Sequence, residues 1–149
     1  MKKTEENILL GNLILLSFRL NGLFMKVGDS ITKPAGQSSA RWQVMGSIYI
    51  EQSSVPQIAR RVGITRQSVQ RIADVLVLEK IAVFIENKLH KKSRLLKLTP
   101  KGIKAMESIQ KEQMNWANKI GGEIGLSTLK KAIVELEKIE LIVQPNADF

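Results

Sequence analysis

Two adjacent helix signals around a glycine constrain the fold of this chain more than any other feature. Ser54 followed by Pro56 is a capping residue followed by a proline, which predicts the start of a short helix over residues 57–62. Gly63 then predicts a turn, and Thr65 is placed to cap a second helix. Two short helices joined by a glycine-containing turn are typical of a helix-turn-helix motif.

The second helix of this motif has an apolar and a polar stripe. Its apolar residues recur at the spacing i, i+3, i+4 and i+7, and they are Val69, Ile72, Ala73 and Leu76. The opposite stripe is polar throughout: Arg66, Gln67, Gln70, Arg71 and Asp74. In a helix-turn-helix the polar stripe enters the DNA major groove, where Arg pairs with guanine and Gln with adenine. The alternative is a solvated helix face. We predict DNA contacts from six residues: Thr65, Arg66, Gln67, Ser68, Gln70 and Arg71.

Two short strands are predicted directly after this helix, over residues 82–86 and 94–98. Residues 87–93 between them contain three Lys and the only His of the chain. This pattern predicts a β-hairpin with a basic tip, and a hairpin after a helix-turn-helix is the wing of a winged helix. The wing can set cations against DNA phosphates or in the minor groove. The predicted contact residues of the wing are Lys88, Lys91, Lys92 and Arg94.

The basic residues are concentrated in the same part of the chain. Twelve of the 23 Lys and Arg residues lie between residues 60 and 104, against three of the 14 Asp and Glu residues. This segment therefore carries the whole formal net charge of +9, and the rest of the chain is neutral overall. A neutral scaffold with one basic stretch is typical of a nucleic-acid-binding protein. We predict double-stranded DNA as a partner.

A long apolar helix is predicted at the N-terminal end, over residues 4–28, with Thr4 as its cap. Apolar residues fill most positions from Ile8 to Val27, on more than one stripe. Such a helix needs burial on more than one side, which in a small domain usually means a second subunit. Residues 28–39 contain proline and glycine and are predicted to form a connection.

Helical sequence is also predicted over residues 101–143, beginning after the cap-and-proline pair Thr99-Pro100. Gly121-Gly122 and Gly125 are predicted to interrupt it, and residues 126–143 then form a final helix with apolar residues at a spacing of three to four.

The N-terminal sequence predicts neither a secretion signal nor a membrane span. Glu5 and Glu6 interrupt the basic start, and Asn12 and Arg19 interrupt the apolar stretch. The longest uninterrupted apolar run of this N-terminal segment, residues 13–16, is far shorter than the roughly 20 residues that span a bilayer. We expect a cytoplasmic protein without a membrane partner.

The composition excludes several classes of chemistry. A chain with no Cys and one His has no disulfide framework, thiolate zinc site or multi-histidine metal site. The sequence contains no paired carboxylates beside a base, no Ser-His-acid set and no phosphate-binding glycine loop. We therefore predict a protein that is not an enzyme and needs no cofactor or metal.

Three segments taken together closely resemble the multiple-antibiotic-resistance regulator (MarR) family of transcription regulators. They are residues 39–45 (SARWQVM), 55–74 (VPQIARRVGITRQSVQRIAD) and 98–102 (LTPKG). The resemblance implies a mainly α fold with a small β-wing, in a single domain over residues 1–149. A winged helix-turn-helix at residues 38–100 would be flanked by dimerisation helices at residues 4–28 and 101–143.

The resemblance also implies a homodimeric repressor on a pseudo-palindromic operator, often relieved by a small aromatic or anionic effector. Effector pockets in the family lie between the dimerisation helices and the DNA-binding part. In this sequence Arg19, Trp42 and Trp116 are the candidate lining residues. A winged-helix protein-interaction module and a nonspecific DNA-binding protein are the alternative functions.

The sequence departs from the family pattern at three places. The wing usually carries Asp-x-Arg, whose arginine enters the minor groove, but here the positions are occupied by His90, Lys91 and Lys92. Lysine is a point charge rather than a planar fork, so the wing contact is expected to be less specific in geometry. The glycine that usually ends the second helix is Lys80, which makes the start of the wing uncertain. The absence of Cys excludes the peroxide-sensing branch.

Overall fold

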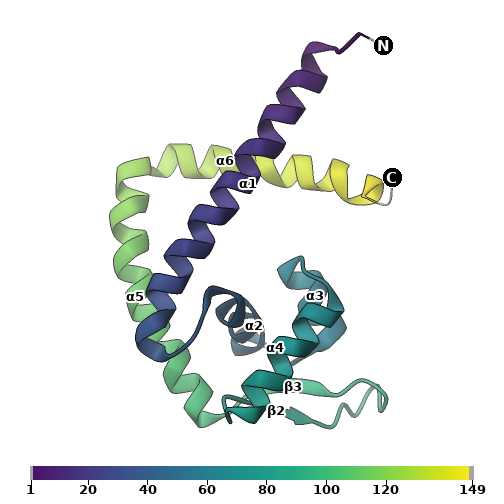
Figure 1. Cartoon of the computed structure of the whole chain (residues 1–149), viewed down its shortest axis with the longest axis vertical. Helices are drawn as coiled ribbons and strands as arrows, with labels where there is room; N and C mark the ends of the chain where they lie inside the picture. The colour runs from purple at the N-terminus through teal and green to yellow at the C-terminus, as the bar shows by residue number, and fades with distance from the viewer. Residues whose placement is uncertain (1, 148–149) are drawn as a thin grey trace. The chain divides into compact units, whose positions relative to one another are not determined.

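The computed structural model describes residues 2–147, and these residues form a mainly helical fold with one small antiparallel sheet, as predicted (Figure 1). The helices are α1 (Glu5–Thr32), α2 (Ser39–Ile50), α3 (Val55–Val62), α4 (Arg66–Leu78), α5 (Pro100–Ile124) and α6 (Leu126–Val143). The strands are β1 (Ser53–Ser54), β2 (Ala82–Ile85) and β3 (Leu95–Leu98), and short 3₁₀ turns lie at Lys33–Ala35 and Gln144–Asn146. The chain forms two compact units, one up to Gln110 and one from Lys111, and α5 continues from one into the other.

Capping residues begin four of the helices, and three of them, Thr4, Ser54 and Thr65, were predicted. The side chains of Thr4, Ser38 and Thr65 accept hydrogen bonds from the backbone N–H three residues later, at 3.2, 3.4 and 3.1 Å. At the start of α3, the Gln57 amide oxygen accepts a hydrogen bond from the Ser54 backbone N–H at 2.8 Å, as in a capping box. Each cap satisfies an otherwise unpaired backbone donor and stabilises its helix by about 1 kcal/mol.

Two glycine-based predictions are wrong. The helix α1 continues through Gly28 to Thr32, so the predicted connection is shorter than expected. Gly28 serves a close approach instead, because a Cβ atom at this position would collide with the side chain of Ser39 at the start of α2. Likewise α5 continues through Gly121 and the following glycine to Ile124, since a glycine inside a helix costs only about 1 kcal/mol. The break comes at Gly125, where φ is 88°.

The sheet has the order β1-β3-β2, with both pairs antiparallel. The pairing of β2 with β3 runs from Ala82 opposite Leu98 to Ile85 opposite Leu95, which confirms the predicted hairpin with each strand one residue shorter. The strand β1 was not predicted, since its two serines pair with β3 only in the folded chain.

One hydrophobic core holds the first unit together. Its fully buried side chains include Met45, Ile58, Leu76, Leu96 and Ile109, which come from α2, α3, α4, β3 and the first part of α5. Figure 1 shows α2, α3 and α4 gathered beside the sheet. Because each fully buried aliphatic side chain contributes about 1.5–3 kcal/mol of burial free energy, this core fixes α4 firmly against its neighbours.

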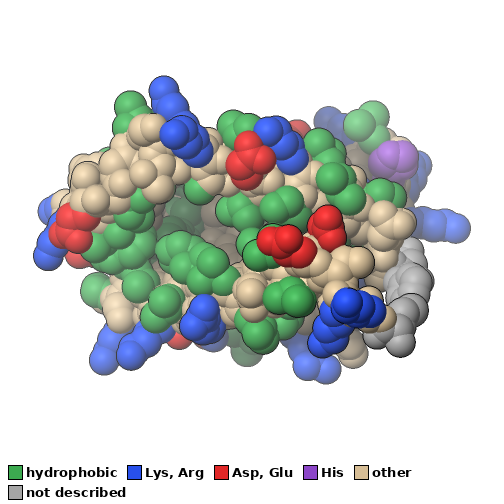
Figure 2. Space-filling model, turned by 90° about the horizontal axis from the view of Figure 1, so that it is seen from above, with side chains coloured by type: hydrophobic (Ala, Val, Ile, Leu, Met, Phe, Trp, Pro, Cys, Tyr) green, Lys and Arg blue, Asp and Glu red, His purple; other side chains and the backbone are tan. Residues whose placement is uncertain are grey.

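The helices α1 and α6 leave large apolar side chains exposed. Those of α1 are Ile8, Leu9, Leu10, Ile14, Leu15, Leu16, Phe18, Leu20, Leu23 and Phe24. Those of α6 are Leu126, Ile133, Val134, Leu136, Leu141, Ile142 and Val143. Hydrophobic side chains cover much of the face of the molecule drawn in Figure 2. Exposed apolar surface of this extent is typical of a surface that binds a partner.

By length and composition, the helical segment Glu5–Ala35 is also long and apolar enough to cross a membrane, because it contains an 18-residue stretch with a mean hydropathy of 1.7. The sequence argument from the longest unbroken apolar run missed this property, because single polar residues such as Asn12 and Arg19 break a run but leave the mean hydropathy of a longer stretch high. A helix that is covered by a second subunit has the same composition, so this property alone does not identify a membrane protein.

Candidate nucleic-acid interface

The polar stripe of α4 is exposed along its length, while the opposite face is buried. Val69, Ala73 and Leu76 point into the core and Ile72 is half-buried, as the spacing predicted. The exposed residues are Arg66, Gln67, Ser68, Gln70, Arg71 and Asp74. The helix therefore presents a row of long hydrogen-bonding side chains on a rigid support.

Two of the predicted contact residues have a structural task at the start of α4. The Thr65 hydroxyl accepts a hydrogen bond from the Ser68 backbone N–H at 3.1 Å, and the two hydroxyl oxygens lie 2.9 Å apart. These contacts fix the first turn of the helix. Thr65 and Ser68 remain predicted DNA contacts, and either hydroxyl can still donate to or accept from a phosphate.

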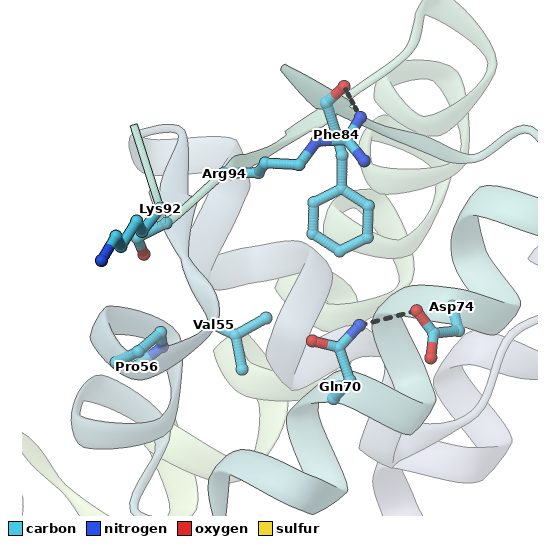
Figure 3. Close-up of a pocket in the computed structure, with 8 residues that line it drawn as sticks. Val55, Pro56, Gln70, Asp74, Phe84, Lys92 and Arg94 are labelled. Carbon is cyan, nitrogen blue, oxygen red and sulfur yellow. Dashed lines mark hydrogen bonds between the residues drawn. The ribbon is translucent and has the colours of Figure 1, made fainter. Parts of the chain in front are cut away.

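Gln70 and Asp74 lie one turn apart on α4 and are joined by a hydrogen bond. The Gln70 Nε2 donates to the Asp74 Oδ1 at 2.7 Å. Figure 3 shows the two side chains next to each other, with the amide oxygen of Gln70 on the side away from Asp74. Asp74 belongs to the polar stripe but was not among the predicted contact residues. The spacing of four residues in the sequence was the signal that could have found the pair.

The wing is a hairpin whose tip is held by Asn87. The Asn87 Oδ1 accepts hydrogen bonds from the backbone N–H groups of Leu89 and His90, at 3.0 and 3.2 Å. The Ser93 backbone N–H donates to the His90 carbonyl oxygen at 2.9 Å. The three lysines of the tip, Lys88, Lys91 and Lys92, are all exposed. The tip therefore displays three cations on a backbone that is tied down locally.

Arg94 at the base of the wing has a partner within the protein. Its Nη2 donates to the Phe84 carbonyl oxygen at 3.0 Å, and its guanidinium carbon lies 5.2 Å from the centroid of the Phe84 ring. This cation–π contact braces the hairpin across its two strands. The prediction that Arg94 contacts DNA is not tested by these contacts, because the side chain is still exposed.

A hollow of about 570 Å³ lies between α4 and the wing (Figure 3). It brings three predicted contact residues together, namely Gln70, Lys92 and Arg94. The other lining residues are Val55, Pro56, Asp74, Phe84 and Ser93. Cations from the wing and an acid from α4 thus border the same space.

Two charged side chains of the basic segment, Arg61 and Glu79, form hydrogen bonds with other residues of the chain. The Arg61 Nη1 donates to the Ser47 carbonyl oxygen and to the hydroxyl oxygens of Ser47 and Ser53, at 2.9, 2.9 and 3.2 Å. Glu79, at the end of α4, accepts two hydrogen bonds from the Arg41 guanidinium at 2.9 and 3.0 Å. Arg61 therefore fastens α2 to α3 and β1, and the Arg41–Glu79 pair ties the end of α4 to α2.

Lys80 allows the chain to turn from α4 into the wing despite the missing glycine. Its φ is 60°, so a lysine adopts the left-handed backbone that glycine normally supplies. The Lys80 backbone N–H donates to the Val77 carbonyl oxygen at 3.0 Å, and the Ile81 backbone N–H donates to the Leu76 carbonyl oxygen at 2.8 Å. These bonds close the last turn of the helix, and β2 follows directly.

The three candidate effector residues lie on three different helices. Arg19 borders a hollow on α1 together with Asn12, Leu15 and Phe18. Trp42 is half-buried on α2, and Trp116 is half-buried on the part of α5 that belongs to the second unit. Their shared role in an effector pocket stays a prediction. Within residues 2–147, no group of three acidic or histidine side chains could hold a metal ion.

Comparison with known proteins finds relatives of this chain in sequence and, at lower identity, in fold. No family profile matches the chain. It is 34% identical over 113 residues to uncharacterised proteins of Mycobacterium tuberculosis and Mycobacterium bovis, and the match covers 76% of this chain and 79% of each relative.

Solved structures with the same fold are more distant in sequence. A MarR family transcription regulator has a TM-score of 0.76 at 17% identity, over 97% of both chains. The M. tuberculosis regulator MosR in complex with DNA has a TM-score of 0.72 at 15% identity, over 87% of this chain and 96% of that one. The Staphylococcus aureus MarR in complex with salicylate and kanamycin has a TM-score of 0.75 at 14% identity, over 94% and 96%. The resemblance seen in the sequence is thereby confirmed at the level of the fold.

Proposed function

The chain belongs to one family with the mycobacterial relatives and has the fold of MarR family transcription regulators, and from this premise we propose that it is a sequence-specific regulator that binds double-stranded DNA. The observation that carries the proposal is the exposed polar stripe of α4 beside a basic wing, both mounted on one buried core. The stripe supplies paired donors and acceptors for base edges, and the wing supplies cations for phosphates. The DNA complex of MosR, which shares the fold, supports this reading.

The regulator acts as a homodimer in this proposal. The exposed apolar side chains of α1 and α6 need a cover, and a second copy of the chain offers the same surface in return. Two recognition helices would then face half-sites about one helical turn apart, roughly 34 Å, on a pseudo-palindromic operator.

The same dimer bears on localisation. A second copy of the chain would cover the apolar side chains of α1 in place of lipid, so we propose a cytoplasmic protein without a membrane partner. A protein recovered in the membrane fraction, and released only by detergent, contradicts this part of the proposal.

The regulator is proposed to act as a repressor that a small aromatic or anionic effector relieves, with Arg19, Trp42 and Trp116 as candidate lining residues. The salicylate complex of the S. aureus protein supports an effector of this chemistry. The two tryptophans of the chain make intrinsic fluorescence a direct readout. A saturable change in fluorescence that also weakens DNA binding supports the proposal, and DNA binding that no aromatic acid alters refutes the role of such an effector.

The experiment that tests the proposed function is selection of duplexes from random DNA by the purified protein. A selected site with two related half-sites supports a dimeric, sequence-specific regulator. Binding of all duplexes with equal affinity and a steep salt dependence indicates the nonspecific electrostatic interaction alone. Failure to bind any duplex favours the remaining alternative, a winged-helix module that contacts proteins.

A further inference from the structure

The acidic side chain of Asp74 on the exposed polar stripe of α4 needs an explanation, because that surface otherwise suits a polyanion. It borders the same hollow as Lys92 and Arg94, so a DNA strand that contacts these cations also approaches the carboxylate. A negative charge there weakens phosphate binding on every sequence. The hydrogen bond of Asp74 to Gln70 shows what the carboxylate does in return.

A glutamine amide has two N–H donors and one oxygen acceptor, and rotation by half a turn exchanges the two ends at little cost. An ionised carboxylate only accepts hydrogen bonds. In the observed orientation Gln70 Nε2 donates to Asp74, and the flipped orientation would bring the amide oxygen against the carboxylate. Asp74 therefore fixes the direction of the amide and uses one of its two N–H groups.

We propose that Asp74 is a positioning residue that makes Gln70 select adenine and reject guanine. This inference rests on the proposed function. The free edge of the Gln70 amide consists of one acceptor and one donor, which matches the N6 donor and N7 acceptor of adenine. Guanine presents two acceptors, O6 and N7, at the corresponding positions. An amide that is free to rotate could donate to guanine, but the amide held by Asp74 would set its oxygen against O6.

The proposal predicts an uncommon combination of effects for Asp74→Ala. Loss of the negative charge raises affinity for all duplexes. Loss of the hydrogen bond lowers the preference for adenine over guanine at one position by about two- to tenfold, where the lower value is the strength of an exposed Gln–Asp pair one turn apart and the higher value lies within the discrimination of a good bidentate pair. General damage to the fold would instead lower affinity. Asp74→Glu keeps an ionised acceptor within reach of the same turn and is expected to retain the preference. The asparagine side chain of Asp74→Asn can donate as well as accept hydrogen bonds and so does not fix the Gln70 amide, and this variant is expected to lose much of the preference for adenine.

Two further variants separate this role from simple charge and from direct contact. Glu86→Gln removes an exposed acid from the same basic segment without touching Gln70, and it is expected to raise affinity on all duplexes and leave base preference unchanged. Gln70→Ala identifies the operator position that Gln70 reads. In the Gln70→Ala background, Asp74→Ala is expected to have no further effect on base preference at that position, because no amide remains for Asp74 to orient. A double-mutant cycle of the two substitutions measures this coupling.

The test is fluorescence anisotropy with the full chain, on the duplex selected by the wild type and on duplexes with a single base-pair change at the position lost in Gln70→Ala. Preference for adenine that falls in Asp74→Ala and Asp74→Asn, but persists in Asp74→Glu and Glu86→Gln, establishes the inference. Unchanged preference in Asp74→Ala, a wild-type preference for guanine, or no position that depends on Gln70 overturns it. A wild type that selects no sequence at all refutes the proposed function itself, which is a different result.

Discussion

The left-handed backbone of Lys80 gives a quantitative prediction about stability. The residue has a φ of 60° at the end of α4. A side chain in this conformation costs about 1–2 kcal/mol through the approach of Cβ to the next carbonyl oxygen, and glycine avoids this cost. Glycine in turn gains about 0.5–1 kcal/mol of backbone entropy in the unfolded chain. The Lys80→Gly variant is therefore expected to be more stable by about 0.5–1 kcal/mol.

Lys80→Ala is the matched control for this prediction. Both variants remove the same charge and the same long side chain, but only alanine keeps the Cβ atom that causes the strain. The backbone hydrogen bonds of Lys80 and Ile81 are available to both. The difference between the two variants therefore isolates the backbone conformation, and both should bind DNA with the same affinity.

Thermal unfolding at a fixed protein concentration measures the effect. For a chain of 149 residues, 1 kcal/mol corresponds to a shift of about 3 °C in Tm, so the glycine variant is expected to melt about 1–3 °C above the wild type. A glycine variant that melts no higher than the alanine variant refutes the argument that Lys80 is strained.

Further predictions concern DNA binding, the dimer and the core. Arg71→Ala is expected to relax base preference at one operator position by about 1–3 kcal/mol, whereas Lys92→Ala weakens binding to every duplex and lowers the salt slope by about one unit; uniform weakening by both contradicts this division. Phe18→Glu places a charge on the exposed apolar surface of α1 and is expected to yield folded monomers in sedimentation velocity, and a persistent dimer argues against α1 as the interface. Leu76→Ala is expected to lower the free energy of unfolding in urea by about 2–5 kcal/mol, while Leu78→Ala, on the exposed face of the same helix, changes it by less than about 0.5 kcal/mol.

The helix starts and the buried face of α4 were predictable because they depend on neighbours in sequence. A capping hydroxyl such as that of Thr65 reaches a donor only three residues away, and the i, i+3, i+4 spacing of Val69, Ile72 and Ala73 already defines one side of a helix. The wing was predictable for a similar reason, since its two strands are separated by a short polar segment and pair with each other.

Features that depend on distant parts of the chain were not predictable. The strand β1 exists only because β3 lies beside it, and the role of Gly28 inside α1 is to let α2 approach closely at that point. The sequence likewise placed Arg61 in the basic segment but gave no sign that its exposed side chain bonds to Ser47 and Ser53. To predict any of these features, one must know where a residue distant in sequence lies in the folded chain.

The sequence predicted the cations and polar residues of the candidate site, but not the contacts that these side chains make with one another and with the rest of the protein. Gln70 and Asp74 were both assigned to the polar stripe, and only their hydrogen bond reveals that one orients the other. Arg94 was predicted as a DNA-contacting cation of the wing, and its stacking on Phe84 depends on the pairing of β2 with β3.

The affinity ratio between the selected duplex and a scrambled duplex of equal length and composition tests the central claim most directly. Both affinities are measured by anisotropy at one salt concentration near physiological, where the electrostatic contribution is the same for the two duplexes. A sequence-specific regulator is expected to prefer the selected duplex by about 10³-fold or more. Equal affinities would contradict the claim that the polar stripe of α4 reads DNA sequence, and would leave only the attraction between the basic segment and the phosphates.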